Sequence, residues 1–363
     1  MGMFTIEIDS GKLKDILKKA DKVCGTLEQA NRKISLFSYE GKLYFLASDG
    51  CLYGYFDLAP YLFPRTFQPF EIPLDVVKQF SLELNGKVNL LFQDNMITFK
   101  CQNEILRLRV NYTGKEISFP KTSDSYIRLY RKKFINELDF ASCFLEEGSY
   151  TNFFITRDCV EFISHHMGIV SYVRLKSESK LENKDEEFRE FSLRIPYVSS
   201  RHIIKALDNE QAEELAIYFD DSVLKLHIKA MNYYTFCGDL AEENPDRIRN
   251  LCRSFQPKLR INSLQLQRLL RRSLILGRFS DVQLYTRSGE LVVISQHGPI
   301  AYRGSMEIEI NLSFSIKTKA HFLKSALTRI GSQYILVDVI DDYVLLSAPS
   351  LSRFLILKNE KIQ

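Results

Sequence analysis

Apolar residues recur along the chain at the spacing of a one-sided helix, and each such stretch is followed by two short apolar runs. The clearest example is residues 260–299. Its apolar stripe follows the i, i+3, i+4, i+7, i+8 rule and consists of Leu266, Leu269, Leu270, Ser273 and Leu274. We expect Ser263 to cap the N-terminus of this helix and Gly277 to end it. VQLYT and LVVIS then predict a hairpin that turns at residues 287–290.

The same pattern occurs six times in the sequence. Helices are predicted at residues 11–24, 73–84, 131–145, 196–207, 263–276 and 317–330, each followed by a hairpin. The first four hairpins are expected to turn at Glu40-Gly41, Gln93-Asp94-Asn95, Arg157-Asp158 and Asp220-Asp221. One copy cannot bury its own apolar face, so the copies should pair. The prediction is an α+β fold of three similar domains, residues 1–120, 121–250 and 251–363, each a pseudo-twofold pair of helix-plus-strands copies.

Two polar segments that contain proline support these boundaries. Residues 111–125 separate the first two domains and residues 239–256 separate the last two, and both are expected to be linkers. The acidic stretch at residues 177–190 is expected to be a solvated loop within the middle domain.

Composition restricts the class of protein further. The chain has 363 residues, of which 45% are hydrophobic, so it can fill more than one core. Seven cysteines without a Cys-x-x-Cys pair argue against a disulfide framework and against a zinc knuckle. No apolar run approaches the roughly 18 residues of a membrane span, and the N-terminus lacks the layout of a signal peptide. We therefore expect a soluble, cytoplasmic protein.

Basic residues are concentrated in the predicted helices. The whole chain carries a formal charge of only +4, whereas the helices are strongly net basic, so the remaining residues are net acidic. The helices at 263–276 and 317–330 contain no acidic residue. Lysine and arginine are good helix formers, which is one explanation. Because the bias recurs among the copies, we favour a surface for a polyanion, and nucleic acid is the obvious one.

Three pairs of residues could suggest a catalytic or metal site. His165 and His166 are adjacent on a predicted strand and should point to opposite faces, so they are unlikely metal ligands. The pairs Asp220-Asp221 and Asp341-Asp342 resemble the paired carboxylates of a nuclease, but both occur where a hairpin turn is expected. The sequence contains no P-loop, dinucleotide fingerprint or nucleophile elbow. We expect no catalytic residue, no metal and no cofactor.

Short motifs in a fixed order carry a resemblance to a known family. They are Leu46-Ala47-Ser48-Asp49-Gly50, Phe119-Pro120, Pro245-Asp246 and the run from Phe279 to Tyr285. In this order the chain resembles, over its full length, the bacterial DNA polymerase III β sliding clamps, as a divergent, phage or accessory member. The resemblance implies a clamp fold, with helices that line a ring and sheets outside, and a head-to-tail homodimer.

The resemblance also implies two sets of functional residues. The residues expected to face DNA are Lys12, Lys18, Lys19, Lys22, Lys132, Arg201, Lys205, Arg268, Arg271, Arg272, Lys319 and Lys324. An apolar cleft for partner peptides is expected at Tyr150, Met167, Gly168, Ile169, Val170, Pro245, Arg249, Phe279, Phe322, Tyr343, Leu355 and Leu357. The sequence departs from the family at residues 166–170, which replace Asp-Gly-His-Arg-Leu, and at the C-terminal end, which lacks Met-Pro-x-Arg-Leu.

Two functions follow as hypotheses. The first is a non-enzymatic clamp that encircles duplex DNA without reading its sequence and binds a DNA polymerase and a clamp loader through short peptide motifs. The second is a metal-dependent DNA-processing enzyme built on repeated α/β units. Basic residues spread over several helices favour the clamp, because an enzyme concentrates charge near one cleft.

Overall fold

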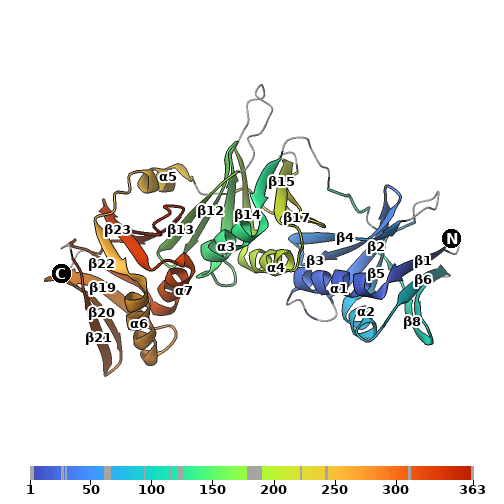
Figure 1. Cartoon of the computed structure of the whole chain (residues 1–363), viewed down its shortest axis with the longest axis horizontal. Helices are drawn as coiled ribbons and strands as arrows, with labels where there is room; N and C mark the ends of the chain where they lie inside the picture. The colour runs from blue at the N-terminus through green and yellow to red at the C-terminus, as the bar shows by residue number, and fades with distance from the viewer. Residues whose placement is uncertain are drawn as a thin grey trace. The chain divides into compact units, whose positions relative to one another are not determined.

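The chain consists of six copies of one unit, a strand followed by a helix and three strands (Figure 1). The computed structural model describes residues 4–25, 28, 31–60, 67–93, 95–114, 116–120, 126–177, 190–220, 223–241, 244–309 and 312–360. Copies one and two are β1 (Phe4–Asp9), α1 (Ser10–Cys24), β2 (Lys33–Tyr39), β3 (Lys42–Ser48) and β4 (Leu52–Pro60), then β5 (Phe70–Pro73), α2 (Leu74–Ser81), β6 (Lys87–Gln93), β7 (Met96–Cys101) and β8 (Glu104–Arg109). A short strand, β9 (Asn111–Tyr112), follows copy two.

The remaining four copies have the same order of elements. Copies three and four are β10 (Ile127–Tyr130), α3 (Arg131–Ser142), β11 (Tyr150–Ile155), β12 (Cys159–His166) and β13 (Ile169–Lys176), then β14 (Phe191–Pro196), α4 (Tyr197–Asp208), β15 (Glu214–Asp220), β16 (Lys225–Lys229) and β17 (Tyr233–Cys237). After helix α5 (Asp246–Arg253), copy five is β18 (Leu259–Asn262), α6 (Ser263–Ser273), the 3-10 turn η2 (Leu274–Leu276), β19 (Asp281–Arg287), β20 (Glu290–His297) and β21 (Ile300–Glu307). Copy six is β22 (Ser315–Lys319), α7 (Ala320–Ile330), β23 (Tyr334–Ile340), β24 (Tyr343–Ser347) and β25 (Arg353–Lys358).

Two consecutive copies form a pair by exchanging their first strands. Strand β1 pairs with β6 of copy two, and β5 pairs with β2 of copy one. The same exchange joins β10 to β15 and β14 to β11, and it joins β18 to β23 and β22 to β19. This exchange is the physical basis of the predicted pseudo-twofold pairs, and the predicted α+β class is confirmed. The boundaries at residues 120 and 250 stay predictions.

The chain divides into two compact units, which we describe separately. The first compact unit comprises Met1–Arg131 and Arg201–Gly238. It contains a four-stranded sheet, β1-β6-β7-β8, and a nine-stranded sheet, β10-β15-β16-β17-β4-β3-β2-β5-β9. Helix α1 packs against α2 and against β3 and β4 (Figure 1). The long sheet is continuous because β17 pairs with β4, so the third strands of copies four and one meet.

The second compact unit comprises Lys132–Ser200 and Asp239–Gln363. Its sheets are the eight-stranded β14-β11-β12-β13-β25-β24-β23-β18 and the four-stranded β21-β20-β19-β22. Helices α6 and α7 pack side by side (Figure 1). Here the continuous sheet depends on β13 and β25, so the third strands of copies three and six meet.

Most predicted turns and helices are confirmed, with small corrections at the ends. Asp9 caps α1 by accepting the Gly11 amide at 2.8 Å, but Asn262 rather than Ser263 caps α6 by accepting the Gln265 amide. Helix α6 ends at Ser273, and a 3-10 turn extends the coil to Gly277. The helices predicted at 73–84 and 131–145 end early, at residues 81 and 142. Asp94, Asp221 and most of the acidic stretch lie outside the described residues.

Three predictions about secondary structure were wrong. The segment 239–256 is not only a linker, because it contains helix α5. The last helix begins at Ala320 rather than near residue 317, because the residues before it extend strand β22. The third strand of each copy was also missing from the prediction of a helix and a hairpin, although this strand joins neighbouring pairs into one sheet.

Candidate functional site

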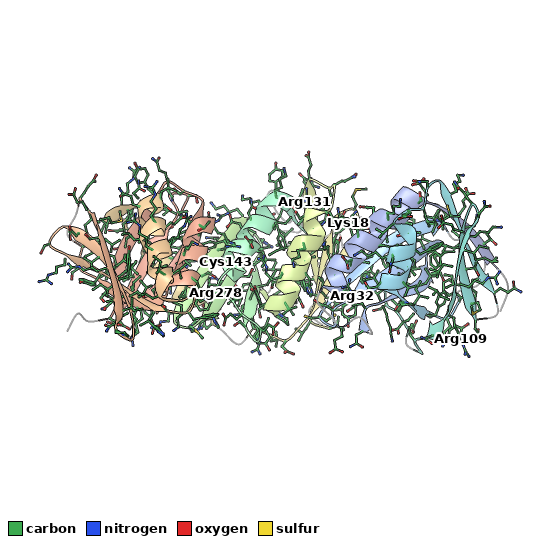
Figure 2. All side chains as sticks on the ribbon, turned by 90° about the horizontal axis from the view of Figure 1, so that it is seen from below. Lys18, Arg32, Arg109, Arg131, Cys143 and Arg278 are labelled. Carbon is green, nitrogen blue, oxygen red and sulfur yellow. The ribbon has the colours of Figure 1, made fainter. Side chains whose placement is uncertain are left out.

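Most of the basic residues expected to face DNA lie at the surface of helices. In the first compact unit, the exposed or half-exposed ones are Lys12, Lys18, Lys22, Arg201 and Lys205. Lys18 is exposed on α1 and is labelled in Figure 2. The ammonium of Lys12 lies 3.6 Å from the Asp57 carboxylate, so part of its charge is neutralised. Lys18 and Lys205 are therefore the strongest candidates for phosphate contacts in this unit.

Lys19 does not lie on this surface. Its side chain is 4% exposed, and its ammonium lies 2.8 Å from the Asp15 carboxylate and 3.6 Å from that of Glu210. Glu210 also accepts hydrogen bonds from Tyr234 and Asn232. Lys19 follows Ile16 by three residues, so it belongs to the apolar stripe of α1 and could have been recognised by its periodicity. The structure therefore corrects its assignment to the DNA-facing set.

The three arginines of α6 are all exposed, but their surroundings differ. Arg268 and Arg272 border a hollow of about 680 Å³ between α6 and the end of β21. Two carboxylates, Glu307 and Glu309, border the same hollow. Arg271 is not among the residues that line it. We therefore separate Arg271, a candidate for DNA contact, from Arg268 and Arg272, which share an acidic neighbourhood.

The other basic residues of the second compact unit also differ in availability. Lys132 is exposed on α3 and Lys324 is half-exposed on α7. Lys319 was expected on a helix, but it is the last residue of β22, and its ammonium lies 2.7 Å from the Asp281 carboxylate. Lys319 thus forms an ion pair within its own sheet, where β19 and β22 are neighbours.

The expected peptide cleft is centred on the hairpin turn between β12 and β13. Met167 and Gly168 form this turn with positive φ angles of 46° and 79°. Glycine adopts such a conformation without strain, whereas a side chain does so rarely. Met167 is 60% exposed at the tip. The turn therefore presents a large flexible apolar side chain to solvent.

A row of four rings lies beside this turn. The ring of His166 packs edge-on against Phe322 at 5.1 Å between centroids, Phe322 lies 3.9 Å from His321, and His321 lies 4.9 Å from Phe279. We call these four residues the ring row. Phe279, at its end, is 58% exposed. Segments from β12, α7 and the loop after α6 thus converge on one surface, as expected for Met167, Phe279 and Phe322.

Sequence reasoning missed the two histidines of the ring row as cleft residues. Neither ring nitrogen of His321 has a hydrogen-bond partner, and burial together with the nearby Arg278 lowers the pKa of His321. His166 contacts the Ser149 hydroxyl through Nδ1 at 3.1 Å. His166 was weighed only as a metal ligand, although it directly precedes the exposed Met167. The ring row therefore offers polar atoms as well as apolar surface.

The remaining cleft residues do not all share that surface. Ile169, Leu355, Leu357, Phe322 and Pro245 are buried. Ile169 pairs with Leu357, whereas the next residue, Val170, pairs with Ile356 and so points to the other face of the sheet.

On that other face, Val170 and Tyr343 pack against an apolar cluster beneath α5. Arg247 of α5 donates a hydrogen bond to the Tyr343 hydroxyl at 2.8 Å. Tyr150 stacks with Arg194, whose guanidinium lies 4.0 Å from the ring centroid. The cleft residues therefore form two surfaces, one on each side of the Met167 turn.

Arg249 holds α5 in place. Its guanidinium donates hydrogen bonds to Glu161 at 2.7 Å and to Glu190 at 2.7 Å. Burial alone would lower the pKa of Arg249, but these two carboxylates raise it overall. Glu161 is buried and also accepts the Tyr172 hydroxyl at 2.7 Å. Because its donors are engaged with carboxylates of its own chain, we assign Arg249 to anchoring α5 rather than to binding a peptide.

The motifs that carry the family resemblance have structural roles. Asp49 accepts the amides of Cys51 and Leu52, at 2.9 and 2.7 Å, and thereby shapes the turn before β4. Its second carboxylate oxygen lies 2.7 Å from Nδ1 of the buried His202. Phe119 stacks on Tyr39 with ring centroids 4.6 Å apart. These motifs thus stabilise the joints between strands.

The candidate metal and catalytic residues were also located. Asp341 and Asp342 form the two-residue turn between β23 and β24, as predicted, because Ile340 pairs with Tyr343. Within the described ranges, no three His, Cys, Asp or Glu side chains are close enough together to hold a metal ion. In the same part of the chain, no helix is both long and apolar enough to cross a membrane.

Comparison with solved structures shows which proteins share this architecture. The DNA polymerase III subunit beta from Pseudomonas aeruginosa matches with a TM-score of 0.80 and 12% identity, over 99% of this chain and 100% of that chain. The beta subunit from Thermotoga maritima has a TM-score of 0.78 and 13% identity, and the DNA polymerase sliding clamp from Bacillus subtilis has 0.79 and 14%, each over 100% of both chains. No protein-family model matches the sequence, and neither does any curated protein compared with it. The chain therefore has the fold of the DNA polymerase III beta sliding clamps, at a low sequence identity.

Proposed function

We propose that this protein is a sliding clamp that encircles duplex DNA and holds a DNA polymerase and other replication or repair proteins on it, without catalysis of its own. The observation that carries the proposal is the full-length clamp fold. A layer of helices with exposed lysines and arginines is consistent with it, because such a layer suits the DNA backbone. Action on cytoplasmic DNA would place the protein in the cytoplasm.

Ring closure would use the two third strands that have no partner at one edge. Within the chain, third strands pair with third strands, β4 with β17 and β13 with β25. The other two third strands, β8 and β21, each end a four-stranded sheet. Exposed edge strands are templates for pairing with another chain. We infer that β8 of one chain pairs with β21 of a second, which would create an eight-stranded sheet like the one already present.

The side chains near these two edges suit such a contact. Ile105 on β8 is 49% exposed, and Ile300 on β21 is 59% exposed. Arg107 and Arg109 are exposed on β8, and Arg109 is labelled in Figure 2. Glu307 and Glu309 are exposed at the end of β21. Apolar and oppositely charged groups are thus available for a heterologous contact, which closes into a ring if its rotation allows.

Contact with DNA would be to phosphates and independent of sequence. Lys18, Lys132, Lys205 and Arg271 are exposed on four different helices, and cations of this kind position a protein on a duplex without reading bases. Binding to short open duplexes would therefore be weak and sensitive to salt.

Partner proteins would dock at the Met167 turn. A peptide with apolar anchors could occupy the ring row on one side of the turn and the Val170 and Tyr343 surface on the other. Methionine is flexible and polarizable, so Met167 can adapt to different anchors. Large apolar side chains gathered on a surface are typical of such docking sites.

The experiment that tests the proposal combines mass and topology. Sedimentation at micromolar concentration should give a dimer, because one chain supplies half of the ring. Protein loaded on circular DNA should be retained through gel filtration and released when the DNA is cut once. A monomer at this concentration, or retention that survives linearisation, would contradict a closed ring.

A further inference from the structure

Two cysteines are directly opposite each other where β17 pairs with β4. The register places Thr235 opposite Tyr53 and Phe236 opposite Leu52, so the next pair is Cys237 and Cys51. The Cys237 amide donates to the Cys51 carbonyl at 2.9 Å, so the register continues to this pair. Opposite residues on antiparallel strands point to the same face, with Cα atoms roughly 4.5–5.5 Å apart. A disulfide spans about 4.4–6.8 Å between Cα atoms, so this backbone geometry accommodates one.

The side chains also approach each other. The Cys51 thiol Sγ lies 2.8 Å from the Cys237 carbonyl oxygen, so the Cys51 side chain is directed toward its neighbour. Both cysteines are half-buried, and neither is in a disulfide. Cys237 borders a hollow of about 600 Å³ on the sheet face, together with Tyr53 and Lys225. A small reagent can therefore reach the pair.

The other five cysteines provide a contrast. Cys24, Cys101 and Cys159 are buried, and burial raises the pKa of the Cys24 thiol to about 11. Cys143 and Cys252 are half-buried. In the register of the described strands, none of these five is opposite another cysteine. Burial also raises the pKa of Cys237, but Lys225, opposite it on β16, acts in the other direction and favours its thiolate.

We propose that Cys51 and Cys237 are a redox modification site that takes a low-molecular-weight disulfide such as oxidised glutathione. One cysteine thiolate attacks a sulfur of glutathione disulfide, which forms a mixed disulfide and releases one glutathione thiolate. The second cysteine thiolate then attacks the protein sulfur of that mixed disulfide and releases the second glutathione. Two protein thiols are oxidised by two electrons, glutathione disulfide is reduced to two thiols, and the two protons pass to the glutathiones.

The bond would join two strands that are far apart in the sequence. Backbone hydrogen bonds alone hold the ladder between β4 and β17, and this ladder makes the nine-stranded sheet continuous. A disulfide at its end would hold the third strands of copies one and four together covalently. This inference does not depend on the proposed clamp function.

The test treats the reduced full-length protein with oxidised glutathione, blocks remaining thiols with an alkylating agent and measures the intact mass. We expect a loss of two hydrogen atoms and one cross-linked pair of peptides that contains Cys51 and Cys237. Cys51→Ser should instead carry one glutathione on Cys237. The matched control Cys143→Ser, which removes another half-buried cysteine, should form the cross-link as wild type does.

Each alternative outcome overturns the proposal. Wild-type protein that keeps its mass, that accumulates separate glutathione adducts on the two cysteines, or that cross-links a different pair would show that the fold does not bring these thiols together. The cross-link should also form faster in the native protein than in urea, since the fold supplies the proximity. An equal rate in urea would contradict this. Amides of residues 233–237 should exchange more slowly after oxidation, and unchanged exchange would show that the bond does not hold the ladder.

Discussion

Lys18 and Lys19 are neighbours on α1, but they lie in different environments, which makes them a matched pair. Lys18 is exposed, whereas Lys19 is buried between Asp15 and Glu210. The substitutions Lys18→Met and Lys19→Met each remove one charge and keep a straight apolar chain of similar length. We expect the first to change DNA binding only and the second to change stability only.

The structure sets the magnitude of the stability effect. Lys19→Met leaves the Glu210 carboxylate buried without its cation, although Tyr234 and Asn232 still donate hydrogen bonds to it at 2.6 and 2.7 Å. Removing one partner of a buried ion pair costs about 3–5 kcal/mol. Because these two hydrogen bonds remain, we expect the lower end, about 3 kcal/mol of unfolding free energy. Lys18→Met should stay within about 0.5 kcal/mol of wild type, as is usual for surface changes.

Two assays separate the effects. Urea unfolding gives the free energy of each variant, and the salt dependence of binding to duplex DNA gives the number of phosphate contacts. Lys18→Met should reduce the log–log salt slope by about 0.9, the value for one contact, and Lys19→Met should leave the slope unchanged. If Lys19→Met matched wild type in urea but lost one contact in the salt slope, then Lys19 would face DNA and the assignment drawn from its burial would be wrong.

Three further predictions concern partner binding, assembly and pH. Met167→Glu should abolish stimulation of a cognate polymerase without lowering the thermal midpoint, while Met231→Glu, at another exposed methionine, should leave stimulation intact; early melting of the Met167 variant would show that this residue is core. Ile105→Asp places a charge on the unpaired edge of β8 and should give a monomer in sedimentation, whereas Met231→Glu should remain dimeric; a dimeric Ile105 variant would exclude that edge as the interface. Burial, with a smaller effect of Lys225, lowers the pKa of His227 from 6.5 to about 4. Between these values the unfolded chain binds a proton that the folded chain does not, so stability should fall by roughly 3 kcal/mol as the pH drops through this window. His227→Gln should flatten this fall in urea unfolding at each pH, and an unchanged fall would exclude His227 as its source.

The repeated copies could be predicted because their signal is local. Side chains three and four residues apart share a helix face, so the stripe of Leu266, Leu269 and Leu270 identifies a helix before any tertiary contact is known. Two-residue turns such as Glu40-Gly41 announce hairpins for the same reason. The order of the short motifs then pointed to the clamp fold, which the full-length structural match confirms.

Helix α5 shows where local signals fail. Its sequence, DRIRNLCR, is strongly polar and reads as a linker. Its position depends on Arg249, which reaches Glu161 on β12, far away in the sequence. The site residues show the same limit, since His321 and His166 join the ring row only after two different copies have packed together.

The sequence alone determined the six copies, their helices and hairpins, and the excess of basic residues on the helices. Tertiary structure decided how copies exchange their first strands, which third strands meet, and whether a given lysine faces solvent or a buried carboxylate. The physical reason is the range of the interactions. Helix periodicity and turn conformation depend on residues within a few positions, whereas strand pairing and the burial of Lys19 beside Glu210 depend on segments nearly two hundred residues apart.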